Sequence, residues 1–240
     1  MLDSPLKITN LQKLFGSNIV FDNINLELNN NEIFGLIGLN GAGKTTLIKT
    51  ILDLLKADKG DISISGISSL SVDSRKNLKY LPEKFQASTL LKGIEFLEIF
   101  NNFNKNKDKT ILENVYELVD MLSLDRQALN KKLSKYSKGM MQKLGLISTF
   151  LDNSKLIILD EPMSGLDPSA RNCLKNLLLK HKNLNKTIFF SSHILSNIDE
   201  ICDRIGILHN NKILFIGTPK ELKEKHNQIS LEKAFLKEIE

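Results

Sequence analysis

Residues 38–45 have the residue types and the spacing of a loop that binds phosphate groups. They read Gly-Leu-Asn-Gly-Ala-Gly-Lys-Thr, follow an apolar run at residues 33–37 and precede apolar residues at helical spacing. Glycine lets the main chain turn sharply and approach a polyphosphate without a clashing Cβ, so backbone N–H groups can donate to phosphate oxygens. The helix that follows directs its positive dipole end at the same anion. The segment therefore predicts a nucleotide-binding loop between a buried strand and a helix.

Three side chains of this loop have specific expected roles. Lys44 places an ammonium group on the terminal phosphates. The Thr45 hydroxyl coordinates Mg²⁺, which prefers oxygen ligands and keeps several waters, and Thr46 contacts an inner phosphate. The nucleotide-binding residues expected in the loop are Gly38, Asn40, Gly41, Ala42, Gly43, Lys44, Thr45 and Thr46.

Two adjacent acids form the second candidate group. Asp160 and Glu161 directly follow the apolar run at residues 156–159, and ligands of open α/β sheets bind beyond the carboxyl ends of the parallel strands. We expect Asp160 to hold Mg²⁺ through a water and Glu161 to act as the general base that polarises the attacking water. An acidic turn exposed to solvent is the alternative, which the phosphate loop in the same chain disfavours.

His193 follows the apolar run at residues 188–190 and two serines, again at the end of an expected parallel strand. An imidazole at that position can reach a terminal phosphate. A lone histidine is more often structural than functional, so the residues alone leave both roles open.

Two kinds of strand must hold these groups in place. The first thirty residues alternate apolar and polar side chains, which predicts antiparallel strands with one solvated face and a turn at Gly16-Ser17-Asn18. Residues 61–66 are a further short strand, and another ends at Tyr80-Leu81-Pro82, where proline removes a backbone donor. The continuous apolar runs at residues 156–159 and 188–190 are typical of parallel strands buried on both faces.

Helical patterns occupy the middle and the end of the chain. Residues 88–150 have helical periodicity, interrupted by the polar stretch at residues 101–110. The tail from Pro219 is amphipathic, and we expect it to pack on the core; its apolar positions are Leu222, Leu231, Phe235 and Ile239. The chain is therefore expected to be an α/β protein: a phosphate-loop NTPase core with a mainly parallel sheet, an N-terminal antiparallel β subdomain and an inserted helical subdomain.

Composition excludes other classes of protein. Of the 240 residues, 41% are hydrophobic and 25% are charged, as in ordinary soluble domains. No apolar stretch approaches the ~20 residues needed to cross a bilayer, and the start has no export signal. Cys173 and Cys202 form no CxxC pair, which favours reduced thiols in the cytosol. The net charge of +5 is spread through polar loops, so no direct nucleic-acid binding is expected. The nearest approach to basic clusters is at Lys105-Asn106-Lys107-Asp108-Lys109 and Lys131-Lys132.

Together these residues resemble the nucleotide-binding subunit of an ATP-binding cassette (ABC) transporter, from Ile8 to Gly217. Residues 136–140, Tyr-Ser-Lys-Gly-Met, resemble a variant of the family's signature motif, and residues 164–167, Ser-Gly-Leu-Asp, resemble its D-loop. Ser192-His193 resembles the switch-histidine motif, and Phe15 stands where the family places an aromatic that stacks on adenine. The ordered set is far more specific than any one of its members.

The resemblance implies ATP and Mg²⁺ as cofactors and a sandwich in which two chains enclose two ATP molecules. Ser137 and the backbone of Gly139, at the start of a helix, would form a second anion-binding end facing the phosphate loop of the other chain. Asp167 would communicate across the dimer, and His193 would contact the γ-phosphate. The expected catalytic residues are Glu161, His193 and Lys44, and the expected metal ligands are Thr45, Asp160 and Glu83.

One ABC ATPase domain over residues 1–240 is expected from the same resemblance. Residues 1–83 would form the antiparallel β region and the phosphate loop, 84–150 the helical subdomain with the signature, 151–217 the catalytic core and 218–240 the helical tail. A homodimer is favoured, since the chain contains both halves of a complete site; a pair with a paralogue is the alternative. It would power a separate membrane-spanning transporter subunit, with export favoured, from the cytoplasmic face of the cell membrane, and the groove around residues 83–103 would receive that subunit's cytoplasmic helix.

Two positions depart from the commonest family pattern. Glu83 occupies the position of the Q-loop glutamine, where a carboxylate can still bind Mg²⁺; Gln86 is the other candidate for that role, three residues out of register. Lys138 replaces the first glycine of the signature, which restricts backbone approach and adds a cation. Both departures resemble the branch of cassette ATPases that pair with export-type (ABC-2-like) membrane proteins.

Other functions stay open from the sequence. A soluble cassette ATPase could act in iron-sulfur assembly, translation or DNA repair; a single cassette without a heptad array or a zinc-type CxxC argues against the last two. A small-molecule kinase would have no use for the signature at residues 136–140. A regulator without hydrolysis is disfavoured by the intact Lys44, Asp160, Glu161 and His193.

Overall fold

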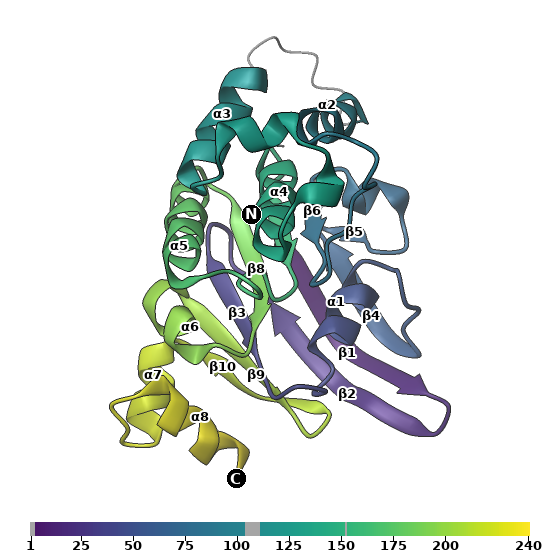
Figure 1. Ribbon diagram of the computed structural model, residues 1–240. Helices are drawn as coiled ribbons and strands as arrows, with labels where there is room; N and C mark the ends of the chain where they lie inside the picture. Colours follow the sequence, from purple (N-terminus) through teal and green to yellow (C-terminus); the bar gives the residue numbers. More distant parts are fainter. Residues whose placement is uncertain (1–2, 104–110, 152) are drawn as a thin grey trace.

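The structure is a computed structural model that describes residues 3–103, 111–151 and 153–240. Two sheets form its framework, one of four strands and one of six (Figure 1). The basic segment Lys105-Asn106-Lys107-Asp108-Lys109 lies outside the described residues. In the described part of the chain, no helix is long and apolar enough to cross a membrane.

The four-stranded sheet is antiparallel, as the alternating pattern of the first thirty residues predicted. Its order is β2-β1-β4-β5, and the strands span Asn18–Glu27, Leu6–Phe15, Lys59–Ile64 and Ile67–Ser68. Gly16 and Ser17 connect β1 to β2, and Gly16 has a positive φ of 60°, which glycine adopts at no steric cost. Alternate residues of β1, such as Leu6 and Ile8, are buried in the core.

The six-stranded sheet has the order β10-β9-β3-β8-β7-β6. These strands span Lys212–Gly217, Arg204–His209, Ile33–Ile37, Thr187–Ser192, Leu156–Leu159 and Leu78–Leu81. The pairs from β9 to β6 are parallel, and β10 pairs antiparallel with β9. Every residue of β3, β7 and β8 is buried, which confirms the prediction of parallel strands covered on both faces.

Alternate residues of the central strands pack into two different hydrophobic layers. Phe34 of β3 stacks on Phe189 of β8, with ring centroids 5.8 Å apart, in the layer shared with α1 (Lys44–Ile51) and the four-stranded sheet. Ile33 and Phe190 belong to the opposite layer, which contains α4 (Lys138–Phe150), α5 (Pro168–Asn183) and α6 (Leu195–Ile201). Helix α1 therefore joins the two sheets through one continuous core.

A helical lobe lies at one end of the molecule. It contains α2 (Gly93–Phe103), α3 (Ile111–Met121) and α4, with 3₁₀ turns η2 (Arg126–Asn130) and η3 (Leu133–Lys135) between α3 and α4 (Figure 1). A further 3₁₀ turn, η1 (Val72–Arg75), precedes β6. The arrangement confirms the predicted class: a phosphate-loop NTPase core with a mainly parallel sheet, an antiparallel β subdomain and an inserted helical subdomain.

The C-terminal tail packs on the core as two helices at the opposite end of the molecule from the helical lobe (Figure 1). Helix α7 (Pro219–Lys225) begins with a capping box between Thr218 and Glu221, and α8 (Leu231–Ile239) begins after Ser230, whose side chain accepts from the amide of Lys233. Between them Asn227 has a positive φ of 51°, which ends the helical pattern. Leu222, Leu231 and Phe235 are buried, as the apolar positions of the tail predicted.

His181 connects the helical lobe to the rest of the core. Its ring, on α5, lies 4.6 Å from the ring centroid of Phe150 at the end of α4, and the residue is 6% exposed. Burial, and then the positive charge of Lys186, lower the pKa of His181 to about 4. The folded chain therefore keeps this imidazole neutral at pH values where the unfolded chain, with an ordinary pKa of about 6.5, binds a proton.

We predict that acidification from pH 7 to pH 5 lowers the free energy of unfolding by about 2 kcal/mol through His181, because the unfolded state binds more protons. This contribution is fully present above about pH 6.5 and is lost as the pH falls towards the lowered pKa. Urea unfolding at both pH values checks it: His181→Phe should remove most of the difference, whereas the control His209→Gln should retain it. The same pH dependence in His181→Phe as in the parent chain would contradict the assignment.

Candidate functional site

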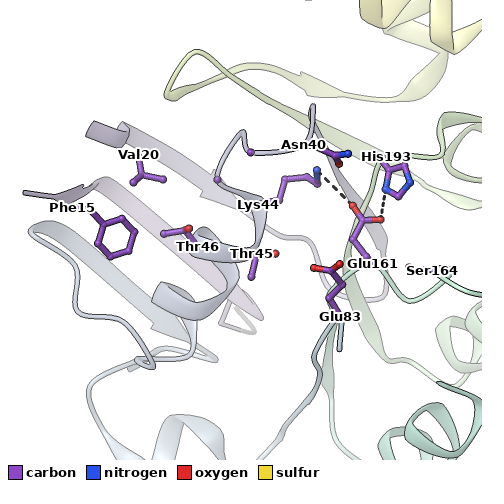
Figure 2. A pocket seen from close by; sticks show the side chains of 12 residues that line it. Phe15, Val20, Asn40, Lys44, Thr45, Thr46, Glu83, Glu161, Ser164 and His193 are labelled. Carbon is purple, nitrogen blue, oxygen red and sulfur yellow. Dashed lines mark hydrogen bonds and ion pairs between the residues drawn. The ribbon is translucent and has the colours of Figure 1, made fainter. Parts of the chain in front are cut away.

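Three loops meet at the carboxyl edge of the six-stranded sheet. Residues 38–43 follow β3, Asp160 and Glu161 follow β7, and His193 follows β8. They border a cavity of about 560 Å³, which runs from Phe15 and Val20 at one end to Glu161 and His193 at the other (Figure 2). The residues that line it are Phe15, Val20, Asn40, Gly41, Gly43, Lys44, Thr45, Thr46, Glu83, Glu161, Ser164 and His193.

The predicted phosphate loop has the backbone that its glycines allow. Gly41 and Gly43 have positive φ angles of 82° and 100°, and Gly43 immediately precedes α1. A Cβ at Gly38 would come within 2.5 Å of the Leu208 carbonyl oxygen, so this position also requires glycine. The loop is thus held against β9 on one side while its other side borders the cavity, where the N-terminus of α1 favours an anion.

Lys44 is a buried cation at the centre of the loop. It is 7% exposed, and its Nζ donates to the carbonyl oxygens of Gly38 at 2.8 Å and Leu39 at 3.3 Å. The same Nζ lies 3.6 Å from Oε1 of Glu161. A terminal phosphate placed in the loop would meet this ammonium group directly and would replace neutral carbonyls by an anion.

Glu161 joins the loop to His193. Its Oε2 lies 2.8 Å from Nδ1 of His193, so Lys44, Glu161 and His193 form one chain of polar contacts across the end of the cavity (Figure 2). Glu161 is 8% exposed and has a positive φ of 48°, an uncommon conformation for this residue type. Backbone strain of this kind is concentrated at functional sites, where the surrounding structure fixes it.

A serine that the sequence reasoning did not select fixes both acids. Ser191, the fifth residue of β8, donates through Oγ to Oδ1 of Asp160 at 2.6 Å and accepts from the backbone N–H of Glu161 at 2.9 Å. All three groups are buried. The sequence shows only that Ser191 lies at the end of a buried strand. Its contacts with Asp160 and Glu161 depend on the register between β8 and β7, which the sequence does not show.

Asp160 lies behind the cavity wall rather than on it. The residue has no exposed surface, and its Oδ2 has no hydrogen-bond partner among the described residues. Burial, and then the negative charges of Asp160 and Glu83, raise the pKa of Tyr80, which places both acids around one tyrosine. A buried carboxylate oxygen with no partner fits a group that is to receive a cation or its bound water.

The expected Mg²⁺ ligands fit a hydrated cation better than a closed protein cage. Thr45 and Glu83 line the cavity, and Asp160 offers its free oxygen from behind. Among the described residues, no three His, Cys, Asp or Glu side chains converge in a geometry that could hold a metal. Mg²⁺ commonly keeps several waters and takes one or two carboxylates together with substrate phosphates, which is compatible with this donor set.

Glu83, rather than Gln86, faces the site. Glu83 lies two residues beyond β6 and borders the cavity, whereas Gln86 is exposed and outside the lining residues that the structure describes. The chain therefore has a carboxylate at the cavity where the family usually has glutamine. Glu83 is one of the Mg²⁺ ligands expected from the sequence.

Three predicted nucleotide-binding residues lie away from this cavity, at helix N-termini. Ser137 caps α4, accepting from the Met140 amide at 3.2 Å, and Asp167 caps α5, accepting from the Ala170 amide at 2.8 Å. The Ala170 amide is the main cause that lowers the pKa of Asp167. A Cβ at Gly139 would lie 3.4 Å from the Gly165 carbonyl oxygen, so the signature and D-loop segments are neighbours.

Comparison with known proteins shows which family has this architecture. The family described as ABC transporter matches residues 21–164. An uncharacterised ABC transporter ATP-binding protein of Nostoc is 38% identical, covering 82% of this chain and 59% of the relative, so the chain matches little more than half of that relative's length. The bacitracin transport ATP-binding protein BcrA of Bacillus licheniformis is 35% identical, covering 89% of this chain and 69% of the relative. A solved structure titled as the ATP binding subunit of an ABC transporter is 28% identical and superposes with a TM-score of 0.90 over 99% of both chains.

We predict that Ser191→Ala lowers the free energy of unfolding by about 1–3 kcal/mol, because it leaves the Glu161 amide and an Asp160 oxygen buried without their partner. Urea unfolding of the parent and variant chains measures the change. Ser134→Ala, at an exposed position outside the site, should change the stability by less than about 0.5 kcal/mol. Equal effects of the two substitutions would show that Ser191 does not support the site.

Proposed function

This chain belongs to the ABC transporter family of ATP-binding proteins, and we propose that it binds and hydrolyses ATP to drive a separate membrane-spanning subunit. The observation that supports hydrolysis most directly is the continuous contact from Lys44 through Glu161 to His193 at one end of the cavity. It places a cation for phosphate, a carboxylate and an imidazole within one site.

The phosphate end of the cavity binds and orients the triphosphate. Backbone N–H groups of the loop donate to phosphate oxygens, and the Lys44 ammonium moves from the Gly38 and Leu39 carbonyls to the terminal phosphates. Thr45, Glu83 and Asp160 would hold Mg²⁺, which would neutralise charge on the phosphate oxygens. Thr46 contacts an inner phosphate, and the remaining loop residues Gly38, Asn40, Gly41, Ala42 and Gly43 supply the backbone cradle.

Glu161 is the general base. Its carboxylate accepts a proton from the attacking water, and the bond from Oε2 to Nδ1 of His193 fixes its orientation. Nδ1–H donates to the carboxylate, so Nε2 contacts a γ-phosphate oxygen as a donor when the ring is an imidazolium with a proton on both nitrogens. A positioned base of this kind contributes a factor of roughly 10²–10⁴ to the rate.

A second copy of the chain completes the site. Ser137, Gly139 and Asp167 lie at the N-termini of α4 and α5, outside the cavity of their own chain. Two copies that face each other bring these helix ends to the partner's phosphate loop, so two ATP molecules are enclosed between them. The presence of both half-sites in one chain supports a homodimer over a pair with a paralogue.

The membrane partner is a separate polypeptide, and we infer export. Relatives are ABC transporter ATP-binding proteins, and one is a bacitracin transport protein by its name.

Residues 83–103 provide the docking surface for the membrane partner, where Leu90 is 79% exposed and Ile99 is 44% exposed. The chain then acts at the cytoplasmic face of the membrane through that partner. A soluble ABC ATPase of iron-sulfur assembly, translation or DNA repair has less support, because these relatives are transporter proteins.

We predict that Glu161→Gln retains ATP binding but lowers the rate of phosphate release about 10²-fold or more, because the proton acceptor is removed while the fold of the site is kept. The variant should therefore accumulate as a dimer in the presence of ATP and Mg²⁺. Phosphate release and the molar mass in solution measure both effects. Glu232→Gln, on α8, is the matched control and should behave as the parent chain. Undiminished hydrolysis in Glu161→Gln would reject Glu161 as the base.

A further inference from the structure

An ion pair between the buried Lys13 and the exposed Asp58 lies directly beside Phe15 at the end of β1. Nζ of Lys13 is 3.0 Å from Oδ2 of Asp58, and the same oxygen accepts from the backbone N–H of Leu14 at 2.8 Å. Nζ of Lys13 also lies over the Phe15 ring, 5.3 Å from its centroid. Lys13 is 8% exposed although it is a lysine in a surface strand. One carboxylate therefore holds both residues that precede the ring.

The strand needs this support because its pairing is irregular. Register shifts interrupt the β1–β2 ladder between Leu11 and Lys13 and again between Lys13 and Leu14. The ladder with β4 is also interrupted, between Thr9 and Gln12, and the Asp58 amide donates to the Gln12 carbonyl at 2.9 Å. Bulged strands redirect their side chains, so the contacts of the last residues decide where Phe15 points.

Phe15 itself is weakly held by packing. It is 51% exposed, and it lines the cavity opposite the phosphate end, next to Val20 (Figure 2). The Lys13 ammonium occupies one face of the ring, which leaves the other face for a planar ligand. A cation over one face attracts the π system and holds the ring in place.

We propose that Asp58 and Lys13 position the Phe15 ring for stacking on the nucleotide base, and so set the preference for a base-bearing ligand over a bare polyphosphate. This inference rests on the proposed nucleotide binding. Asp58 fixes the backbone at Leu14 and anchors Lys13, and Lys13 covers one face of the ring. Both act through Phe15 and are positioning residues. The Leu14 amide and Lys13 lower the pKa of Asp58, so its carboxylate is charged at neutral pH.

The chain contains no tryptophan, which gives the proposal a direct optical probe. Phe15→Trp places a single indole at the stacking position. We expect ATP to quench its fluorescence by stacking, and tripolyphosphate to bind the loop without a comparable quench. The ratio of the ATP affinity to the tripolyphosphate affinity measures how much the base contributes to binding. Stacking of the base alone should raise the affinity about 5- to 150-fold.

Asp58→Ala and Lys13→Met are then each introduced into the Phe15→Trp chain. Each should reduce the preference for ATP over tripolyphosphate about five-fold or more and weaken the fluorescence quench by ATP. The affinity for tripolyphosphate should stay unchanged. Lys13→Arg, which keeps the cation and the ion pair, should restore most of the preference. Lys7→Met is the matched control, because Lys7 is an exposed lysine of the same strand in an ion pair with Glu27. It should retain both the preference and the quench.

The outcomes separate this inference from the proposed function. If the Phe15→Trp chain bound neither ATP nor tripolyphosphate, nucleotide binding itself would be rejected. If it bound both, but without an ATP-dependent quench, or with the same preference in Asp58→Ala and Lys13→Met as in Lys7→Met, the positioning role would be overturned. An equal loss of ATP and tripolyphosphate affinity, or a Lys13→Arg variant as weak as Lys13→Met, would also overturn it.

Discussion

The parallel pairing of β3 with β8 and of β8 with β7 brings three loops that are distant in the sequence to one edge of the six-stranded sheet. Because these strands are buried on both faces, a shift of register would move apolar side chains out of both layers and separate the loops. Ser191 reinforces this register where it matters, since its hydroxyl contacts Asp160 and the Glu161 amide from the neighbouring strand. The positions of the phosphate loop, the acids and His193 therefore depend on one set of strand pairs.

The two ends of the cavity belong to different sheets, and α1 holds them together. Phe15 extends from the antiparallel sheet, whereas Glu161 and His193 extend from the parallel one. Leu47, Ile48 and Ile51 of α1 pack in the layer shared by both sheets. In the proposed nucleotide site, α1 therefore has two roles: its N-terminus faces the phosphates, and its packing fixes the distance between Phe15 and Glu161.

The fold class, the phosphate loop and the acid pair could be predicted from the sequence because their signals are local. A glycine-rich loop between a strand and a helix, an acid pair after an apolar run and alternating strands each occupy one short segment. The positions of Phe15 and Glu83 and the role of His193 came from the family resemblance. Val20 and Ser164, which also line the cavity, were not among the predicted site residues.

Ser191 and the Asp58–Lys13 pair were not found, because each depends on which strands or turns meet in space. The cap role of Asp167 is different: its contact with the Ala170 amide spans only three residues, and an aspartate directly before Pro168 is a local signal for a helix start. The tail was expected as helical, but its division at residues 226–230 depends on the local conformation of Asn227 and the cap at Ser230. The assignment of Asp167 and Ser137 to a second copy comes from family resemblance and stays a proposal.

We propose that the loop at residues 38–45 and the Lys44–Glu161–His193 chain form one site for a triphosphate. A crystal structure of the chain with a non-hydrolysable ATP analogue and Mg²⁺ tests it most directly. We expect Lys44 Nζ to leave the Gly38 and Leu39 carbonyls and to lie about 3 Å from a terminal phosphate oxygen, with Glu161 beside the γ-phosphate. An analogue bound elsewhere, with Lys44 still on both carbonyls, would contradict it.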